Sequence, residues 1–190
     1  LPGEGVVETD WLVGKPLGGK YFVQRITLDL RGRTRQDVVR EWVTTLVSAI
    51  RRHDSRHLIT VGEIPWAAVF PGAKSVFHPS EEEYGLDFVS VHFYPESGKT
   101  DQALAALFSY DIGKPLVVEE MFPLKCSIED LQSFVDGSRD RVSGYFGFYW
   151  GRTIDEYSQP PVTIQAAILK AWLEYFRDHG STVLHPTEAK

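Results

Sequence analysis

The stretch of sequence that decides the fold is Lys114-Pro115-Leu116-Val117-Val118-Glu119-Glu120-Met121-Phe122. Its apolar, partly β-branched centre predicts a buried strand of a parallel sheet. Glu119 and Glu120 follow where this strand should end. A carboxylate is costly to bury without a partner, so acids at the end of a core strand usually border a polar cleft. In α/β barrels the active site is built at this end of the strands, and we therefore predict a catalytic acid here.

Three further segments have the composition of strands that end in polar or aromatic residues. They span residues 58–62, 86–94 and 144–150. Four helices are expected around these strands, over residues 34–53, over residues 101–111, from Ser127 onward and over residues 163–179. The helix over residues 163–179 is expected to stop at Gly180. The alternation predicts one α/β domain over residues 1–190, with a parallel sheet and outer helices. The first 33 residues are expected to be irregular.

The composition limits the classes of function. The chain has 190 residues, 43% of them apolar, and a net charge of -6, which argues against nucleic acid or an anionic membrane as its partner. No apolar run approaches the roughly 18 residues that span a bilayer. The single cysteine excludes an internal disulfide, and the histidines have no metal-ligand spacing, so we predict neither a metal nor another cofactor. A G-x-S-x-G elbow and a phosphate-binding loop are also absent from the sequence.

His92 and Tyr94 lie two residues apart on one predicted strand and therefore share a face. Such a pair could orient a carboxylate and tune its acidity by hydrogen bonding. The alternative is an amphipathic strand end with a satisfied histidine. Glu119 and Glu120 should point to opposite faces if their strand stays extended, and the alternative for them is a pair of solvated acids.

Two tryptophans and one more acid complete the candidates. Trp150 ends a strand that is rich in glycine and aromatic residues, and its ring could stack on a sugar, although a strand-end tryptophan is more often part of a core. Trp66 follows Pro65 and suits the same role. Glu63 could contact substrate or act as a second acid, and a structural salt bridge is an equal alternative.

Together these motifs resemble the C-terminal half of cellulase-like family 5 glycoside hydrolases, which are clan-A enzymes with a (β/α)8, or TIM, barrel. The matching pieces are His92-Phe93-Tyr94, Val118-Glu119-Glu120-Met121-Phe122 and Phe148-Tyr149-Trp150. They would lie on the sixth, seventh and eighth strands of the barrel. The resemblance implies a half barrel, strands five to eight, of a retaining hydrolase that cleaves β-1,4-linked glucan, an endoglucanase of cellulase type.

The resemblance also implies roles for single residues. Glu120 would be the nucleophile, Tyr94 would hydrogen-bond to it, and His92 would contact the sugar and the carboxylate. Trp150 would form the floor of the subsite in which the sugar is attacked. The family has an aromatic-glycine pair where this chain has Met121-Phe122, and Glu119 therefore stays open as the alternative nucleophile.

The family's acid/base glutamate lies in an Asn-Glu-Pro motif, which this sequence lacks. The chain begins with Leu1-Pro2-Gly3 and not with methionine, and we expect that the acid lies upstream. The expected partners are a poly- or oligosaccharide and either the missing N-terminal barrel half or a second copy of the chain. In a homodimer Glu63 would be the best local substitute for the acid. The resemblance favours an extracellular location.

Two other readings stay open. The chain could be a non-hydrolytic carbohydrate-binding or inactive half-barrel remnant that uses Trp66 and Trp150 as stacking surfaces. It could also be an open α/β domain with the strand order of flavodoxin, although no glycine-rich turn is prepared for a phosphate.

Overall fold

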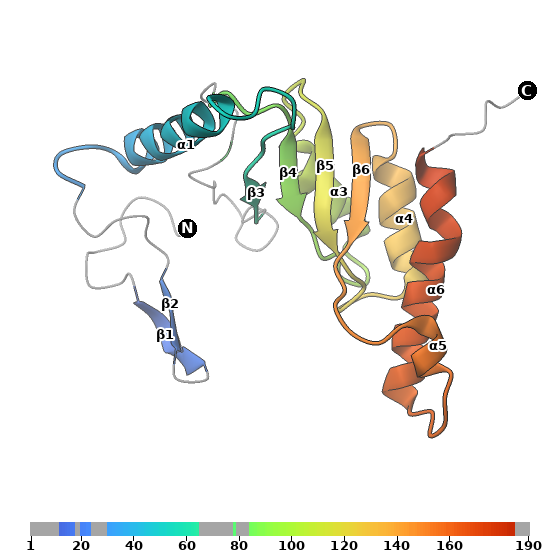
Figure 1. Ribbon diagram of the computed structural model, residues 1–190. Coiled ribbons are helices and arrows are strands. Elements are labelled where there is room, and N and C mark those ends of the chain that lie inside the picture. Colours follow the sequence, from blue (N-terminus) through green and yellow to red (C-terminus); the bar gives the residue numbers. More distant parts are fainter. Residues whose placement is uncertain (1–11, 18–19, 24–29, 65–77, 79–83, 185–190) are drawn as a thin grey trace, which may run out of the picture.

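The computed structural model describes residues 12–17, 20–23, 30–64, 78 and 84–184. Figure 1 shows their helices and strands. In chain order these are β1 (Leu12–Leu17), β2 (Lys20–Val23), α1 (Arg35–Arg51), β3 (Gly62–Glu63), β4 (Val89–His92), α3 (Thr100–Phe108), β5 (Leu116–Met121), α4 (Ile128–Ser138), β6 (Val142–Gly147), α5 (Ile154–Tyr157) and α6 (Ile164–Leu184).

A four-stranded parallel sheet with the strand order β3-β4-β5-β6 forms the centre of the described structure (Figure 1). The predicted parallel α/β architecture is thereby confirmed. Each strand lies beside the one that precedes it in the sequence, as expected when successive β–helix units follow each other around a sheet. The flavodoxin order, 2-1-3-4-5, places its second strand out of sequence beside the first, and the described strands show no such step.

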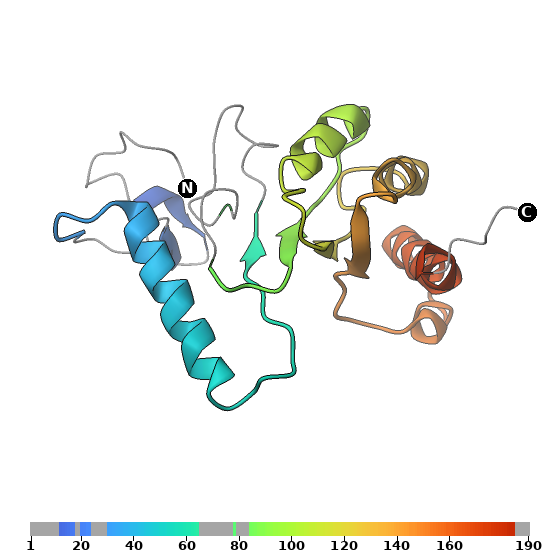
Figure 2. The same ribbon diagram turned by 90° about the horizontal axis from the view of Figure 1, so that it is seen from above.

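Helices α3, α4 and α6 lie in an arc along one face of the sheet (Figure 2). The side chains that β4 and β5 direct to this face, such as Val91, Val118 and Met121, are buried together with Leu107 of α3 and Phe134 of α4. The rings of Phe134 and Phe93 stack with their centroids 5.2 Å apart. Within the described part of the chain, no helix crosses the opposite face of the sheet (Figure 2).

Helix α1 lies beyond the β3 edge of the sheet (Figures 1 and 2). Its start is a capping box, as the three-residue spacing of Thr34 and Asp37 in the sequence predicts: the Thr34 hydroxyl accepts from the Asp37 amide at 3.1 Å, and the Asp37 carboxylate accepts from the Thr34 amide at 2.9 Å. This helix packs in a small separate cluster, in which Val39 and Val43 are buried against Tyr84, and its last residue, Arg51, pairs with Asp87. The outer side of α1 leaves large apolar side chains exposed, namely Trp42, Leu46 and Ile50.

Several predicted bounds are wrong. Part of the supposedly irregular first segment is the antiparallel hairpin of β1 and β2, in which Val13 pairs with Phe22. The first strand of the sheet has two residues only, and β6 ends at Gly147, before Trp150. Helix α6 continues through Gly180 to Leu184, because a glycine inside a helix costs only about 1 kcal/mol. None of the described helices has the length and apolar character that crossing a membrane requires.

Candidate functional site

Strand β5 bulges where the two predicted acids lie. Val91 of β4 pairs with Val118, but the next residue, His92, pairs with Glu120, so β5 carries one residue more than β4 at this point. The pairing of β5 with β6 shifts its register over the same stretch. A bulge re-aims the side chains of the strand that carries it. The expectation that Glu119 and Glu120 point to opposite faces is therefore wrong, because the strand does not stay extended.

Burial on either side of the bulge explains why both acids turn the same way. Val118 and Met121 are fully buried on the helix-covered face of the sheet. Two residues lie between these anchors, whereas a regular strand has an odd number of residues between two side chains on the same face. Glu119 and Glu120 both turn to the open face, where their side chains are 26% and 23% exposed.

Aromatic packing holds the end of β5 in place after the bulge. Phe122 is buried, stacks on Phe176 at 5.9 Å, and meets Trp172 edge-on at 5.0 Å between ring centroids. Tyr149 also stacks on Phe122, with the ring centroids 5.8 Å apart. Phe122 thus ties the strand end to α6 and to the segment after β6.

The imidazole of His92 lies between the two carboxylates. Its Nε2 is 2.8 Å from Oε1 of Glu119, and its Nδ1 is 3.3 Å from Oε2 of Glu120. The ring is itself partly exposed on the open face of β4. The structure therefore brings together three of the predicted site residues in one group.

The hydroxyl of Tyr94 donates a hydrogen bond to Oε1 of Glu120. Burial raises the pKa of this hydroxyl well above its usual range, and the hydrogen bond to Glu120 and the charge of that carboxylate raise it further. Tyr94 therefore stays protonated and keeps donating over the whole pH range in which enzymes normally work. Glu120 is the carboxylate that both His92 and Tyr94 contact.

Gly62 of β3 forms the wall beside Glu119 and was not recognised as a site residue. A Cβ at this position would lie 1.9 Å from Oε1 of Glu119 and 2.8 Å from Nε2 of His92. The residue must lack a side chain if Glu119 and His92 are to meet there. A glycine at the end of a predicted strand was the available signal, since it often marks a close approach.

Glu63 follows Gly62 and points to the other face of the sheet. Its side chain is buried, with 5% of the residue exposed. Burial raises the pKa of Tyr110, and the negative charge of Glu63 raises it further, so the two groups lie near each other. Tyr110 belongs to the core beneath the helices. The structure thus separates Glu63 from the group around Glu120.

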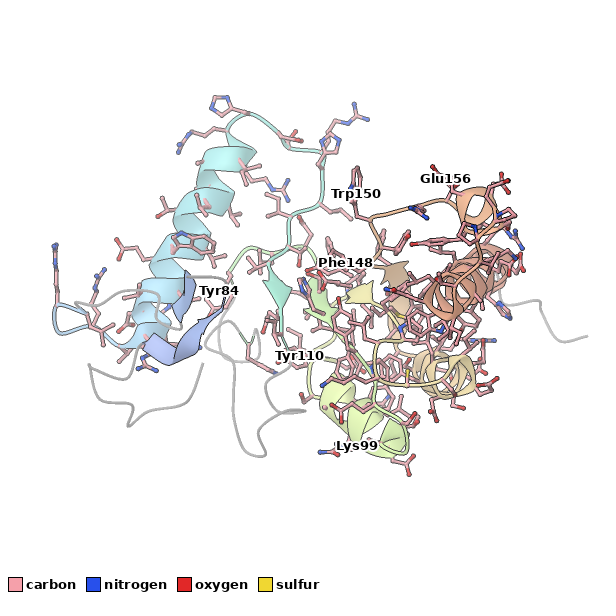
Figure 3. The ribbon with its side chains drawn as sticks, turned by 90° about the horizontal axis from the view of Figure 1, so that it is seen from below. Tyr84, Lys99, Tyr110, Phe148, Trp150 and Glu156 are labelled. Atoms are coloured by element: carbon pink, nitrogen blue, oxygen red, sulfur yellow. The ribbon has the colours of Figure 1, made fainter. Side chains whose placement is uncertain are left out.

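Large aromatic side chains of β6 and the segment after it are exposed. Phe146 and Phe148 are 61% and 57% exposed, and Trp150 is 98% exposed. Trp150 projects from the segment that joins β6 to α5, farther from the strands than Phe148 (Figure 3). Its ring therefore contacts almost nothing in this structure. Trp66, the other predicted stacking residue, lies outside the described residues.

The site consists of the carboxylates of Glu119 and Glu120 with His92 and Tyr94, on the open face of the sheet, which also carries exposed aromatic rings. Glu120 can act as a nucleophile or a base, and Tyr94 and His92 can orient it. Among the residues that the structure describes, no three histidine, cysteine or acidic side chains are placed to hold a metal ion.

No family model matches this chain, and comparisons with curated proteins and with solved structures find no match either.

Proposed function

We propose that the chain carries the nucleophile of a retaining glycoside hydrolase that cleaves β-1,4-linked glucan, with Glu120 as the attacking group. One observation supports this function above all. The Glu120 carboxylate lies at the C-terminal end of a parallel strand, on the open face, and contacts both Tyr94 and His92. This is the end of the strands at which barrel enzymes build their active sites.

The reaction would proceed in two steps. An oxygen of Glu120 attacks the anomeric carbon, the bond to the leaving glycosyl oxygen breaks, and a separate acid protonates that oxygen. Water then attacks the glycosyl ester, gives its proton to the same acid/base group, and releases Glu120 with overall retention. Tyr94 and His92 would orient the carboxylate for the first step, and an exposed aromatic ring such as Trp150 would stack on the sugar.

The acid/base group is proposed to come from further β/α units that cover the open face. Glu119 is already bound to His92, and Glu63 lies on the opposite face. The edge strand β3 and the exposed outer side of α1 can accept such units, because an open strand edge pairs readily with another strand. These units belong to the same polypeptide or to a second copy of the chain. The complete assembly would then be a (β/α)8 barrel.

A fluorinated glycoside with a good leaving group tests the nucleophile separately from the acid. 2,4-Dinitrophenolate departs without protonation, so 2,4-dinitrophenyl 2-deoxy-2-fluoro-β-cellobioside should react even where no acid is present. We expect one covalent label, found by mass spectrometry on the peptide that contains Glu120. Glu120→Gln should abolish the label, and Glu119→Gln, the matched control, should keep it.

Two outcomes contradict the assignment. A label on Glu119 would make that residue the nucleophile. This alternative stays open because Met121-Phe122 stands where the family that the chain resembles has an aromatic-glycine pair. The absence of any label on wild-type protein, with the fold intact by circular dichroism, would reject the glycosidase. Cleavage of carboxymethylcellulose, mannan and xyloglucan, followed by reducing-sugar release, then identifies the natural linkage.

The exposed aromatic side chains of β6 and the segment after it favour a second candidate function, the binding of carbohydrate without hydrolysis. Phe146, Phe148 and Trp150 are mainly solvent-exposed, which is costly unless such rings contact something. Binding of cello-oligosaccharides, measured by calorimetry, that survives Glu120→Gln and is lost in Trp150→Ala without any product release would support this candidate in place of the enzyme.

A further inference from the structure

A cavity of about 210 Å³ lies on the helix-covered side of the sheet, opposite to the face that carries Glu120. Helices α4 and α6 lie side by side next to β6 on this side (Figures 1 and 2). The wall of the cavity is formed by Met121 of β5, Val135 of α4, Tyr145 of β6 and four residues of α6 between positions 175 and 180. The chemistry proposed for the open face uses none of these residues.

The cavity extends from the surface of the protein into its core. Two of its lining residues, Met121 and Val135, are buried, with 1% and 2% of each residue exposed. Two others, His179 and Gly180, are exposed. A Cβ on Gly180 would meet no heavy atom within 4 Å, so this part of α6 is uncrowded. A small molecule can therefore reach the cavity without unfolding of the core.

The polar groups of the wall already form hydrogen bonds within the protein. The Tyr145 hydroxyl lies 2.8 Å from Oγ of Ser138, the Tyr175 hydroxyl donates to Oε1 of Gln132 at 2.7 Å, and Nδ1 of His179 donates to the Tyr175 carbonyl at 2.9 Å. Burial raises the pKa of Tyr145 and raises the pKa of Tyr175 to about 12, so both hydroxyls stay neutral. No lysine, arginine, aspartate or glutamate is among the described residues that line the cavity. A buried water needs two to four polar partners, so these walls hold water poorly.

Aromatic rings make up most of the wall. The rings of Tyr175 and His179 stack with their centroids 4.4 Å apart, and Phe176 meets Tyr175 edge-on at 5.5 Å. Aromatic rings attract a further ring in offset or edge-to-face contact, and the thioether of Met121 also suits contact with a ring. An engineered apolar cavity of about 150 Å³ binds benzene in another protein, so the cavity described here is large enough for one substituted ring.

We propose that this cavity binds a small uncharged molecule that contains one aromatic ring. The ring would lie against Tyr175 and Phe176 of α6, with Met121 at its inner end. Apolar and ring–ring contacts would provide the affinity, and a charged molecule would be rejected because the wall has no group to pair with it. Binding would not depend on Glu120, because the two sites lie on opposite faces of the sheet.

Met121 is the only methionine of the chain, so its methyl group reports on the cavity through one NMR signal. The full chain is labelled with methionine that carries a carbon-13 methyl group and is titrated with toluene, and Met121→Leu identifies the signal. We expect the signal to shift and to saturate as the toluene concentration increases, because the added ring lies beside the methyl group. Benzoate, which has the same ring and a negative charge, should cause no shift.

Two matched variants locate the binding site. Val135→Phe should weaken toluene binding roughly tenfold or more, because the added ring takes up the space of the ligand. Val162→Phe, the same change at an exposed position before α6, should leave the affinity unchanged. Val135→Leu, a smaller addition, should weaken binding less and serves if Val135→Phe is poorly folded.

Three outcomes would overturn the proposal. The first is a Met121 signal that does not move up to the solubility limit of toluene. The second is an equal shift with benzoate, and the third is equal toluene affinity in the wild type and in both Val135 variants, since the ligand would then not occupy this cavity. None of these results depends on whether Glu120 is labelled by the fluorinated cellobioside, so this proposal and the proposed function fail separately.

Discussion

The two faces of the sheet differ in what their side chains do. The face under α3, α4 and α6 is a continuous apolar core, in which Leu107, Leu116 and Phe134 are completely buried. The opposite face carries His92, Glu119 and Glu120, which bind one another, beside aromatic rings that are mostly exposed. Residues of the same strands contribute to both faces, because successive side chains of a strand alternate.

This difference indicates that the residues which stabilise the fold and the residues which can react lie on opposite faces of the sheet, because side chains alternate along each strand. The apolar face holds β4, β5 and β6 in register, and the bulge in β5 then places a polar group on the other side without removing a core residue. Substitutions on the covered face should therefore change the free energy of unfolding. Substitutions of exposed side chains on the open face should change the chemistry with at most a small loss in the free energy of unfolding, unless they break the contact between Glu119 and His92.

The largest expected effect is that of Phe134→Ala on the covered face. Phe134 is fully buried and stacks on Phe93, so its removal should lower the free energy of unfolding by about 3–5 kcal/mol. Phe148→Ala, the same change on the open face, should lower it by at most about 1 kcal/mol, since more than half of that ring is exposed. Urea denaturation measures both, and equal losses would show that the open face is covered in solution.

A smaller effect is expected from Gly62→Ala, which adds one methyl group to the open face. The new Cβ would lie 1.9 Å from Oε1 of Glu119, so that side chain has to move and give up its hydrogen bond to His92. We expect a loss of roughly 1–3 kcal/mol in the free energy of unfolding.

Gly144→Ala is the matched control for this substitution. Its new Cβ would lie 3.9 Å from Val117, which is ordinary contact. The change should be neutral or stabilising by up to about 1 kcal/mol, because alanine reduces the freedom of the unfolded chain. A Gly144→Ala protein as unstable as Gly62→Ala would show that the glycines matter for the strands and not for the Glu119–His92 contact.

Tyr94→Phe should affect reactivity more than stability. It removes the hydroxyl that donates to Glu120, and we expect the rate of labelling by the fluorinated cellobioside to fall roughly tenfold. Tyr149→Phe removes a hydroxyl that donates to the Arg152 carbonyl, away from Glu120, and should leave this rate unchanged. Equal rates for wild type and Tyr94→Phe would mean that the Tyr94 contact does not orient the carboxylate.

Features that depend on neighbouring residues in the sequence could be predicted. The capping box at Thr34, the helix start at Ser127 and the apolar run before Glu119 have local causes, and all three are present in the structure. A third capping box, Thr153 with Glu156, was missed although its sequence signal is the same. The Gly18-Gly19 pair between two strand-like runs was likewise an available hairpin signal.

Features that depend on strand pairing could not be predicted. The bulge arises from the register of β5 against β4 and β6 together, and no single segment encodes it. For the same reason Gly62 could not be placed beside Glu119, which lies 57 positions later in the sequence, and Glu63 could not be assigned to the covered face. His92 and Tyr94 were grouped correctly because they lie two residues apart, at the end of β4 and just after it.

The smallest expected effect concerns Glu96, which connects the loop after β4 to the loop after β5 through its ion pair with Lys125. The hydrogen bonds from Lys99 and Lys125 lower the pKa of Glu96 to about 2, below its usual value, and the charges of both lysines add to the shift. A carboxylate with a lowered pKa in the folded state stabilises the protein above its unfolded pKa, and this contribution is lost as the pH falls through about 4 toward 2.

The wild type should therefore lose slightly more stability than Glu96→Gln between pH 6 and pH 3, as a shift of the urea midpoint. The difference should shrink in high salt, because all three groups are exposed and their attraction is screened. An identical pH dependence for both proteins would show that this contact does not hold the two loops together. The rim of the open face would then depend on the backbone contact between Glu96 and Lys125 alone.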